Sequence, residues 1–115
     1  MRCLIQVEYR DSLLRIREEV LQSLGRPIIS VLGSRAAMAL NLSEIAPGVI
    51  IIGHRASRSE RQELIEHFRK TSPETPIIAL LGHYDVQFEN VNFNCPADDP
   101  PLWVSMVTQA STGIQ

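Results

Sequence analysis

The stretch that most constrains the fold is residues 47–55, with the sequence Pro-Gly-Val-Ile-Ile-Ile-Gly-His-Arg. Its four consecutive branched aliphatic residues cannot alternate between a buried and a solvated face. The pattern therefore predicts a strand that is covered on both faces, as in the centre of a parallel sheet. Ligands in open parallel sheets bind beyond the carboxyl ends of the strands, so Gly53 and His54 lie where a functional site is expected.

Four other apolar runs predict strands, and helical patterns separate most of them. The last of these strands is half-exposed, because its apolar residues alternate with asparagines. The segment 82–90 is predicted to hold at most one or two helical turns, around residues 84–88. The predicted strands are 3–8, 27–32, 77–81 and 91–95, and the predicted helices are 13–24, 35–42, 59–70 and 100–110.

The first helix is predicted to bury Leu13, Ile16, Val20 and Leu24, with Arg17 among the polar residues on its other face. Short polar residues before each helix are candidate N-caps, because their side-chain oxygens accept hydrogen bonds from free backbone N–H groups. For the third helix, the pairs Ser57/Glu60 and Ser59/Gln62 both fit a capping box. The other candidates are Asp11 or Ser12, Ser34, and Asp98 or Asp99.

Alternation of strands and helices predicts right-handed βαβ crossovers and an α/β fold. We expect a flavodoxin-like three-layer α/β/α sandwich, with a five-stranded parallel sheet in the order 2-1-3-4-5. In that order the ends of the first and third strands flank the topological switch point. With 115 residues the chain is expected to form a single domain, residues 1–115, with one core.

Composition narrows the classes of function. A net charge of −2 argues against a nucleic-acid-binding module, which needs a basic face. Four arginines, at positions 10, 55, 58 and 61, could still form a local patch, although scattered arginines are more often simply solvated. Cys3 and Cys95 lie in apolar runs and suit a reducing cytoplasm. No signal-type segment and no apolar run of membrane-spanning length is present, so no membrane association is expected.

Over nearly its whole length the sequence resembles the receiver domain of two-component response regulators, the CheY-like superfamily. The closest stretch, residues 47–82, follows the family pattern of proline, apolar strand, loop, helix, Pro-x-Thr-Pro and apolar strand. Most of the matching residues are packing residues. The resemblance therefore supports the fold more strongly than the function.

The resemblance implies a pocket whose reactive residues are missing here. Such receivers use an acidic pair for Mg²⁺, a phosphoacceptor aspartate, a Ser or Thr, and a Lys followed by proline. At the acidic pair only Glu8 matches, with Tyr9 beside it, and the phosphoacceptor position is Gly53. Phosphoryl transfer needs a carboxylate nucleophile and a cation, so this chemistry does not carry over. The hydroxyl position is Leu81, the lysine position is Cys95, and the proline survives as Pro96.

A second hypothesis is a small enzyme or a metal site. Glu8, His54, His83 and Cys95 are all predicted at or just beyond the carboxyl ends of strands, where they could bind Zn²⁺ or form a thiolate–imidazole pair. The four residues lack the short spacing of a specific Cys/His motif, and each has an ordinary packing or loop role available. No glycine-rich phosphate loop appears, so no cofactor is expected.

The sequence favours a degenerate, phosphorylation-independent receiver-like domain. It is expected to be non-enzymatic, without cofactor or metal, and to bind a protein partner in cytoplasmic bacterial signalling or regulation. Receivers that it resembles often associate through the face of the last strand and last helix, which makes a homodimer the first possibility and a different protein the second. Trp103 or Met106 is expected to be partly exposed there, unless Trp103 closes the core. The candidate partner surface is Phe88, Phe93, Leu102, Trp103 and Met106.

Overall fold

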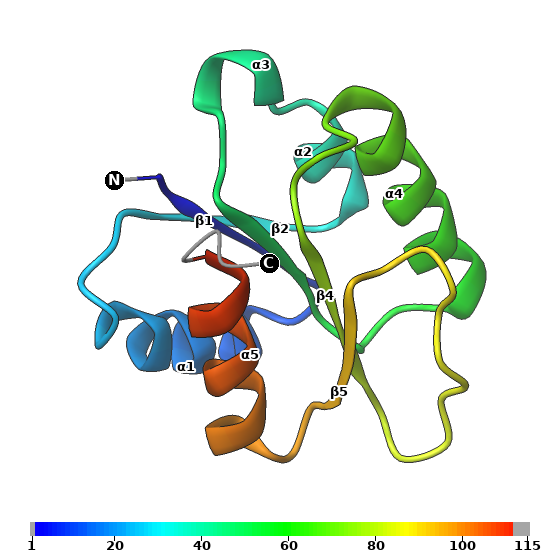
Figure 1. Ribbon diagram of the computed structural model, residues 1–115. Helices are drawn as coiled ribbons and strands as arrows, with labels where there is room; N and C mark the ends of the chain where they lie inside the picture. Colours follow the sequence, from blue (N-terminus) through cyan, green and yellow to red (C-terminus); the bar gives the residue numbers. More distant parts are fainter. Residues whose placement is uncertain (1, 112–115) are drawn as a thin grey trace.

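Five parallel strands lie in the order β2-β1-β3-β4-β5, which confirms the predicted topology (Figure 1). The computed structural model describes residues 2–111, and the outer ends of the expected domain, residue 1 and residues 112–115, lie outside them. The registers Val7↔Ile52 and Ile52↔Ala79 align the ends of the three central strands. The strands are β1 (Leu4–Glu8), β2 (Ile28–Leu32), β3 (Val49–Ile52), β4 (Ile77–Leu81) and β5 (Phe93–Pro96).

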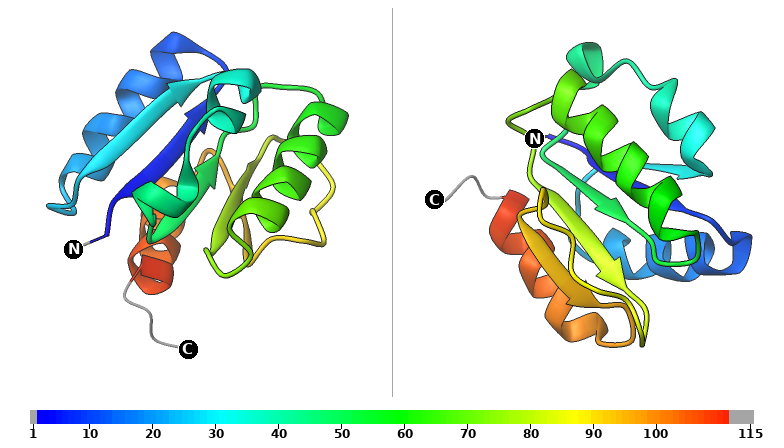
Figure 2. Two further views of the ribbon diagram at one scale, coloured as in Figure 1. Left: turned by 90° about the horizontal axis from the view of Figure 1, so that it is seen from above. Right: turned by 90° about the vertical axis from the view of Figure 1, so that its right-hand side faces the viewer.

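Helices cover both faces of the sheet, which gives three layers (Figure 2). The helices α1 and α5 pack on one face, and the helices α2, α3 and α4 pack on the other. None of the helices among residues 2–111 is long and apolar enough to cross a membrane. The helices are α1 (Asp11–Gln22), α2 (Ser34–Met38), α3 (Leu42–Ile45), α4 (Arg58–Thr71) and α5 (Pro100–Ser111).

The central strands supply side chains to two separate cores, because successive residues of a strand point to opposite faces. Ile50 and Ile52 join Phe68 on the α4 side, whereas Val49 and Ile51 join Trp103 on the α5 side. All four residues of β3 are buried. The interpretation of residues 49–52 as a strand covered on both faces is therefore confirmed.

Helix starts follow the predicted caps only in part. The Ser57 side chain accepts a hydrogen bond from the Glu60 backbone N–H at 3.1 Å, so the first capping box is the one used. Asp99 accepts from the Leu102 N–H at 3.3 Å. The other two assignments are wrong, because Arg10 and Gly33 occupy the N-cap positions of α1 and α2 without a side-chain cap.

The predicted helix at 35–42 is two short helices. Asn41 breaks it, because its side chain accepts from the Glu44 N–H at 3.3 Å and starts α3. Ala46 then ends α3 in the left-handed conformation, with φ of 49°. A short helix, α3, thus directly precedes the turn into β3.

The buried row of α1 is shifted by one position from the prediction, because Arg17 and Leu21 are buried in place of Ile16 and Val20. Ile16 is 58% exposed, whereas Arg17 is only 6% exposed. Leu13, Arg17 and Leu21 form an i, i+4, i+8 row toward the sheet, and this row satisfies helical spacing as well as the predicted one. Arg17 is buried at this position because the Glu8 carboxylate, at the end of β1, needs a positively charged partner.

A segment without helix, residues 82–92, connects β4 to β5. Arginines of α4 hold it in place: Arg58 donates to the Val86 and Gln87 carbonyls at 2.5 and 2.9 Å, and Arg69 donates to the Asn90 carbonyl at 2.8 Å. Phe88 of this segment is 3% exposed and lies under the Arg58 guanidinium, 4.1 Å from its carbon to the ring centroid. The backbone of this irregular segment is thus tied down by side chains of one helix.

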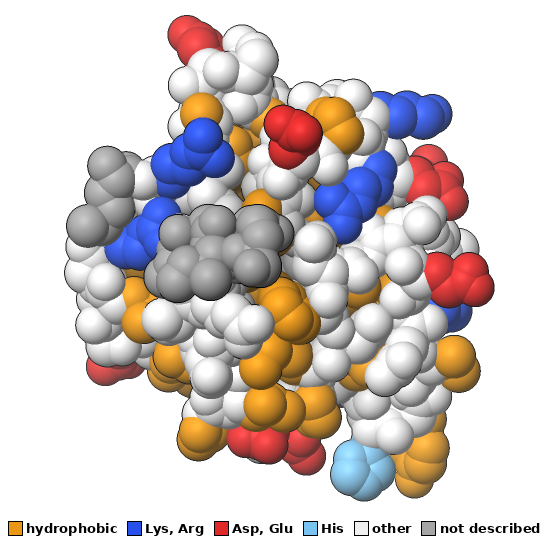
Figure 3. Space-filling view, viewed as in Figure 1, with side chains coloured by type: hydrophobic (Ala, Val, Ile, Leu, Met, Phe, Trp, Pro, Cys, Tyr) orange, Lys and Arg blue, Asp and Glu red, His pale blue; other side chains and the backbone are white. Residues whose placement is uncertain are grey.

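Two members of the predicted partner surface are buried. Trp103 is 1% exposed and belongs to the α5-side core, which is the stated alternative in which it closes the core, and Phe88 is 3% exposed. Met106 and Phe93 are half-buried, and Leu102 is 38% exposed. Figure 3 shows hydrophobic side chains gathered over α5 on this face of the molecule.

Candidate functional site

The carboxyl ends of β1 and β3 carry a buried ion pair. Glu8 is the last residue of β1 and is 1% exposed. Its Oε2 accepts a hydrogen bond from Arg17 Nη1 of α1, and these two atoms form a buried salt bridge. A charge taken out of water is costly unless a partner of opposite charge accompanies it. Arg17 therefore supplies the counter-charge of the carboxylate that ends the first strand, while Glu8 Oε1 is buried without a hydrogen-bond partner among residues 2–111.

His54 joins this pair from the loop after β3. Its Nδ1 lies 3.3 Å from Arg17 Nη2. A guanidinium can only donate, so Nδ1 must be the acceptor and the ring is neutral with its proton on Nε2. The pKa of His54 is lowered by burial first, and then by the positive charges of Arg17 and Arg55. Burial raises the pKa of Glu8, although Arg17 pulls it in the opposite direction.

Gly53 leaves the space that the Glu8 carboxylate occupies. A Cβ built on Gly53 would meet both carboxylate oxygens and the carboxylate carbon of Glu8 inside van der Waals contact, with Oε2 at 2.6 Å. The carboxylate cannot move away cheaply, because it is buried and bound to Arg17. The side chain from β1 thus fills the position of the missing side chain on β3.

A magnesium ion does not fit these residues. Mg²⁺ prefers several hard oxygen ligands and gives up its water reluctantly. Glu8 offers one carboxylate, one oxygen of which is bound to a guanidinium. The guanidinium of Arg17 would also repel the ion. The pocket therefore has neither the oxygen donors nor the negative charge that Mg²⁺ requires.

The remaining positions of the family pocket serve other purposes here. The hydroxyl of Tyr9 forms a hydrogen bond with Ser34 Oγ at 2.8 Å, and burial raises its pKa. Leu81 packs against the α4-side core. Cys95 is 2% exposed within the α5-side core, and burial raises its thiol pKa, which opposes thiolate chemistry. Pro96 is exposed and pairs with Leu81 in the sheet.

The four residues of the enzyme or metal hypothesis do not form one cluster. Arg17 links Glu8 to His54, whereas Cys95 is buried in the core and His83 lies exposed beside Tyr84, with ring centroids 5.6 Å apart. Within residues 2–111, no three side chains of His, Cys, Asp or Glu are close enough together to hold a metal ion. The geometry therefore gives that hypothesis no support.

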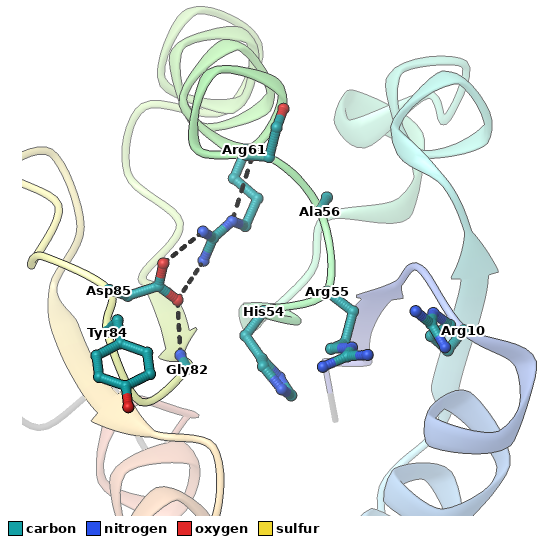
Figure 4. A pocket seen from close by; sticks show the side chains of 9 residues that line it. Arg10, His54, Arg55, Ala56, Arg61, Gly82, Tyr84 and Asp85 are labelled. Carbon is teal, nitrogen blue, oxygen red and sulfur yellow. Dashed lines mark hydrogen bonds and ion pairs between the residues drawn. The ribbon is translucent and has the colours of Figure 1, made fainter.

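A basic hollow opens beside the ion pair at the same edge of the sheet (Figure 4). It has a volume of about 500 Å³ and includes three of the four arginines that the sequence marked as a possible patch, Arg10, Arg55 and Arg61. The fourth, Arg58, turns instead to the segment 82–92. Arg61 is bound bidentately by Asp85 at 2.8 and 3.0 Å, and the pKa of Asp85 is lowered first by this hydrogen bonding.

Sequence reasoning missed Arg17 and Asp85. Arg17 had a usable signal, because it lies four residues before Leu21 on the row that α1 buries. Asp85 had none, since it belongs to a segment of irregular backbone whose course depends on α4. Both residues matter to the site because each one pairs with a charge that would otherwise be unmatched.

Comparisons with known proteins bear on the fold. No family model matches the sequence, and no curated protein matches it either. Among solved structures, a response regulator receiver domain protein from Clostridium thermocellum superposes with a TM-score of 0.84 at 13% identity, covering 97% of this chain and 95% of that one. A response regulator receiver protein from Sinorhizobium medicae gives 0.79 at 15% identity, with the same coverage.

A CheY-like receiver domain protein from Methanospirillum hungatei gives a TM-score of 0.81 at 13% identity, covering 97% of this chain and 94% of that one. Identities this low establish the shared architecture and leave the chemistry to the residues described above. The strand order and the helices on both faces agree with these structures. The chain therefore has the flavodoxin-like, CheY-like fold of response-regulator receiver domains.

Proposed function

We propose that the protein is a degenerate receiver-like domain that works without phosphorylation and binds a protein partner in a cytoplasmic bacterial signalling or regulatory pathway. The observation that carries this proposal is the buried Glu8–Arg17 ion pair that fills the space over Gly53. The position that would need a nucleophile, Gly53, has no side chain. The position that would need a metal cation lies next to the positively charged guanidinium of Arg17. The domain has no catalytic role of its own in this proposal.

The ion pair also bears on switching. A receiver that is phosphorylated changes the charge of its pocket when the phosphoryl group arrives. Among residues 2–111, Arg17 holds a permanent positive charge beside the only carboxylate at the ends of β1 and β3, and both side chains are buried. The pocket is therefore held in one electrostatic state, which suits a domain that presents a constant surface.

The proposal predicts that small phosphodonors will not modify the protein. We expect no gain of a phosphoryl group on incubation with acetyl phosphate and Mg²⁺, because Gly53 offers no nucleophile. Intact-mass spectrometry measures this directly, with an active receiver domain treated in parallel as a control. A stoichiometric, base-labile phosphoryl adduct would contradict the proposal and would reveal an acceptor carboxylate elsewhere in the chain.

For the partner surface, we retain the exposed and half-buried part of the predicted face, which we call the α5 surface: Leu102, Met106 and Phe93. Accessible apolar side chains of this kind are common at interfaces, and Figure 3 shows hydrophobic side chains gathered over α5 on this face. The buried Trp103 supports this surface from beneath and does not contact a partner. Self-association is the first use that we propose for it.

A charge placed on the α5 surface should weaken self-association. We expect the double variant Leu102→Glu/Met106→Glu to raise the dissociation constant of the homodimer by at least about tenfold, because two carboxylates would be desolvated at the interface. Sedimentation equilibrium over a range of concentrations measures it. Thr108→Glu is the matched control, because Thr108 is exposed on another side of α5. A wild-type protein that stays monomeric at all concentrations would eliminate the homodimer and leave a different protein as the partner.

A further inference from the structure

The basic hollow contains positive charges that the protein itself does not neutralise. Within residues 2–111, Arg17 pairs with Glu8 and Arg61 pairs with Asp85, but neither Arg10 nor Arg55 forms an ion pair. The nearest acid along the chain, Asp11, is bound to Arg15 at 2.8 Å. Two unpaired guanidiniums thus lie at one opening of a chain whose net charge is −2.

These two arginines come from different loops and share one opening. Arg10, from the end of the β1–α1 loop, and Arg55, from the β3–α4 loop, both line this hollow (Figure 4). Like charges that converge without a counter-ion repel each other, and this repulsion is relieved when an anion binds between them. The guanidinium fork also matches the oxygens of a phosphate group.

The hollow is larger than a single ion requires. A second hollow of about 600 Å³ shares His54, Arg55, Gly82 and Tyr84 with the first. These volumes lie within the range of small-molecule sites, about 300–1,000 Å³. Tyr84, which is 95% exposed, lines both hollows, whereas Asp98 lines only the second and disfavours a further negative charge there.

We propose that this site, the arginine pocket of Arg10, His54, Arg55 and Tyr84, binds a small organic phosphate non-covalently and without a metal ion. The phosphate lies between Arg10 and Arg55, and the uncharged part of the ligand extends toward Tyr84. The site differs from a phosphoacceptor pocket, because the space over Gly53 is filled by Glu8. It is also independent of the proposed partner surface, which lies on α5.

Calorimetric titration at constant ionic strength tests this, with adenosine monophosphate, adenosine and inorganic phosphate as probes. We expect saturable binding of adenosine monophosphate, with adenosine at least about tenfold weaker because it lacks the charge-assisted hydrogen bonds of the phosphate. Arg55→Ala and Arg10→Ala should each weaken phosphate-dependent binding about tenfold. The matched control is Lys70→Ala, which removes one exposed positive charge in the last turn of α4, at the other end of the helix from the pocket.

Histidine ring resonances provide a second measurement. The His54 signals should shift on addition of adenosine monophosphate or inorganic phosphate, whereas those of His67, which faces away from the pocket on α4, should not. Because Arg10 and Arg55 are exposed, both variants should keep the unfolding temperature of the wild type. Absence of saturable binding of either phosphate probe up to about 10 mM, or equal weakening by Lys70→Ala, would overturn the proposal.

Discussion

Replacing Arg17 with methionine is expected to lower the free energy of unfolding at pH 7 by about 3–5 kcal/mol, since breaking a buried ion pair leaves an uncompensated charge. Glu8 would stay in the interior with neither water nor a cation beside it. Chemical denaturation of the wild type and the variant measures the difference. A loss below about 1 kcal/mol would mean that the pair is not needed to keep Glu8 buried.

Arg15→Met is the matched control for that experiment. Arg15 lies in the same helix and pairs with Asp11, but both side chains are well exposed, at 77% and 60%. Its loss should cost no more than about 0.5 kcal/mol. The double variant Glu8→Leu/Arg17→Met should recover most of the stability, because hydrophobic side chains of similar volume can replace a buried pair at little cost.

The effect of Arg17→Met should depend on pH. Burial raises the pKa of Glu8 in the folded state above its value in the unfolded state. The contribution of Glu8 to the free energy of unfolding is therefore fully present below the unfolded-state pKa, and it is lost as the pH rises through the folded-state pKa. Removing Arg17 removes two of the three influences that lower the pKa of Glu8, its charge and its hydrogen bond. The variant should therefore be closest to the wild type in acid and furthest from it at neutral pH. The Asp85–Arg61 pair is present in both proteins, so its own pH dependence cancels in the difference between their free energies of unfolding.

A second large effect is expected for Gly53→Asp, which places a carboxylate where the family keeps its phosphoacceptor. We expect this variant to lose about 3–5 kcal/mol at pH 7, because its Cβ overlaps the Glu8 carboxylate and its charge is buried beside a like charge. Gly53→Ala isolates the steric part and should lose about 1–3 kcal/mol. Gly53 has an ordinary negative φ, so backbone strain adds nothing.

Magnesium should not rescue Gly53→Asp. Leu81 and Cys95 still supply neither an oxygen nor a positive charge, and the Arg17 guanidinium still opposes a divalent cation. Thermal unfolding with and without Mg²⁺ at about 10 mM checks this, because a ligand that binds only the folded state raises the midpoint. A clear rise with Mg²⁺ in Gly53→Asp, and none in Gly53→Ala, would show that Glu8 can leave Arg17 to coordinate a metal.

The Glu8–Arg17 pair and the segment 82–92 alter the same edge of the fold in different ways. One fills the pocket at the ends of β1 and β3, and the other connects β4 to β5 by irregular backbone held by Arg58, Arg61 and Arg69. Both changes use arginine side chains as fixed hydrogen-bond donors. The result is a CheY-like fold in which an ion pair fills the space at the ends of β1 and β3 and the rim beside it is basic.

Much of the architecture could be predicted from the sequence. The residues that determine it act locally or through periodicity: four aliphatic residues before Gly53 can only be a strand buried on both faces, and Ser57 with Glu60 marks the start of α4. Alternating strands and helices leave few topologies for a chain of this length. These signals depend on backbone geometry and hydrophobic burial, which nearby residues largely decide.

The site depended on contacts that no local pattern contains. Ile16 and Arg17 are neighbours that both fit a helical stripe, and only Glu8, at the end of another element, selects the arginine for the interior. Trp103 is buried because α5 lies closely on the sheet, although its helical band suggested a wide, partly exposed face. Sequence periodicity therefore determined which elements form and how they are ordered, whereas tertiary packing decided which charges are buried, because that depends on partners brought together only by the fold.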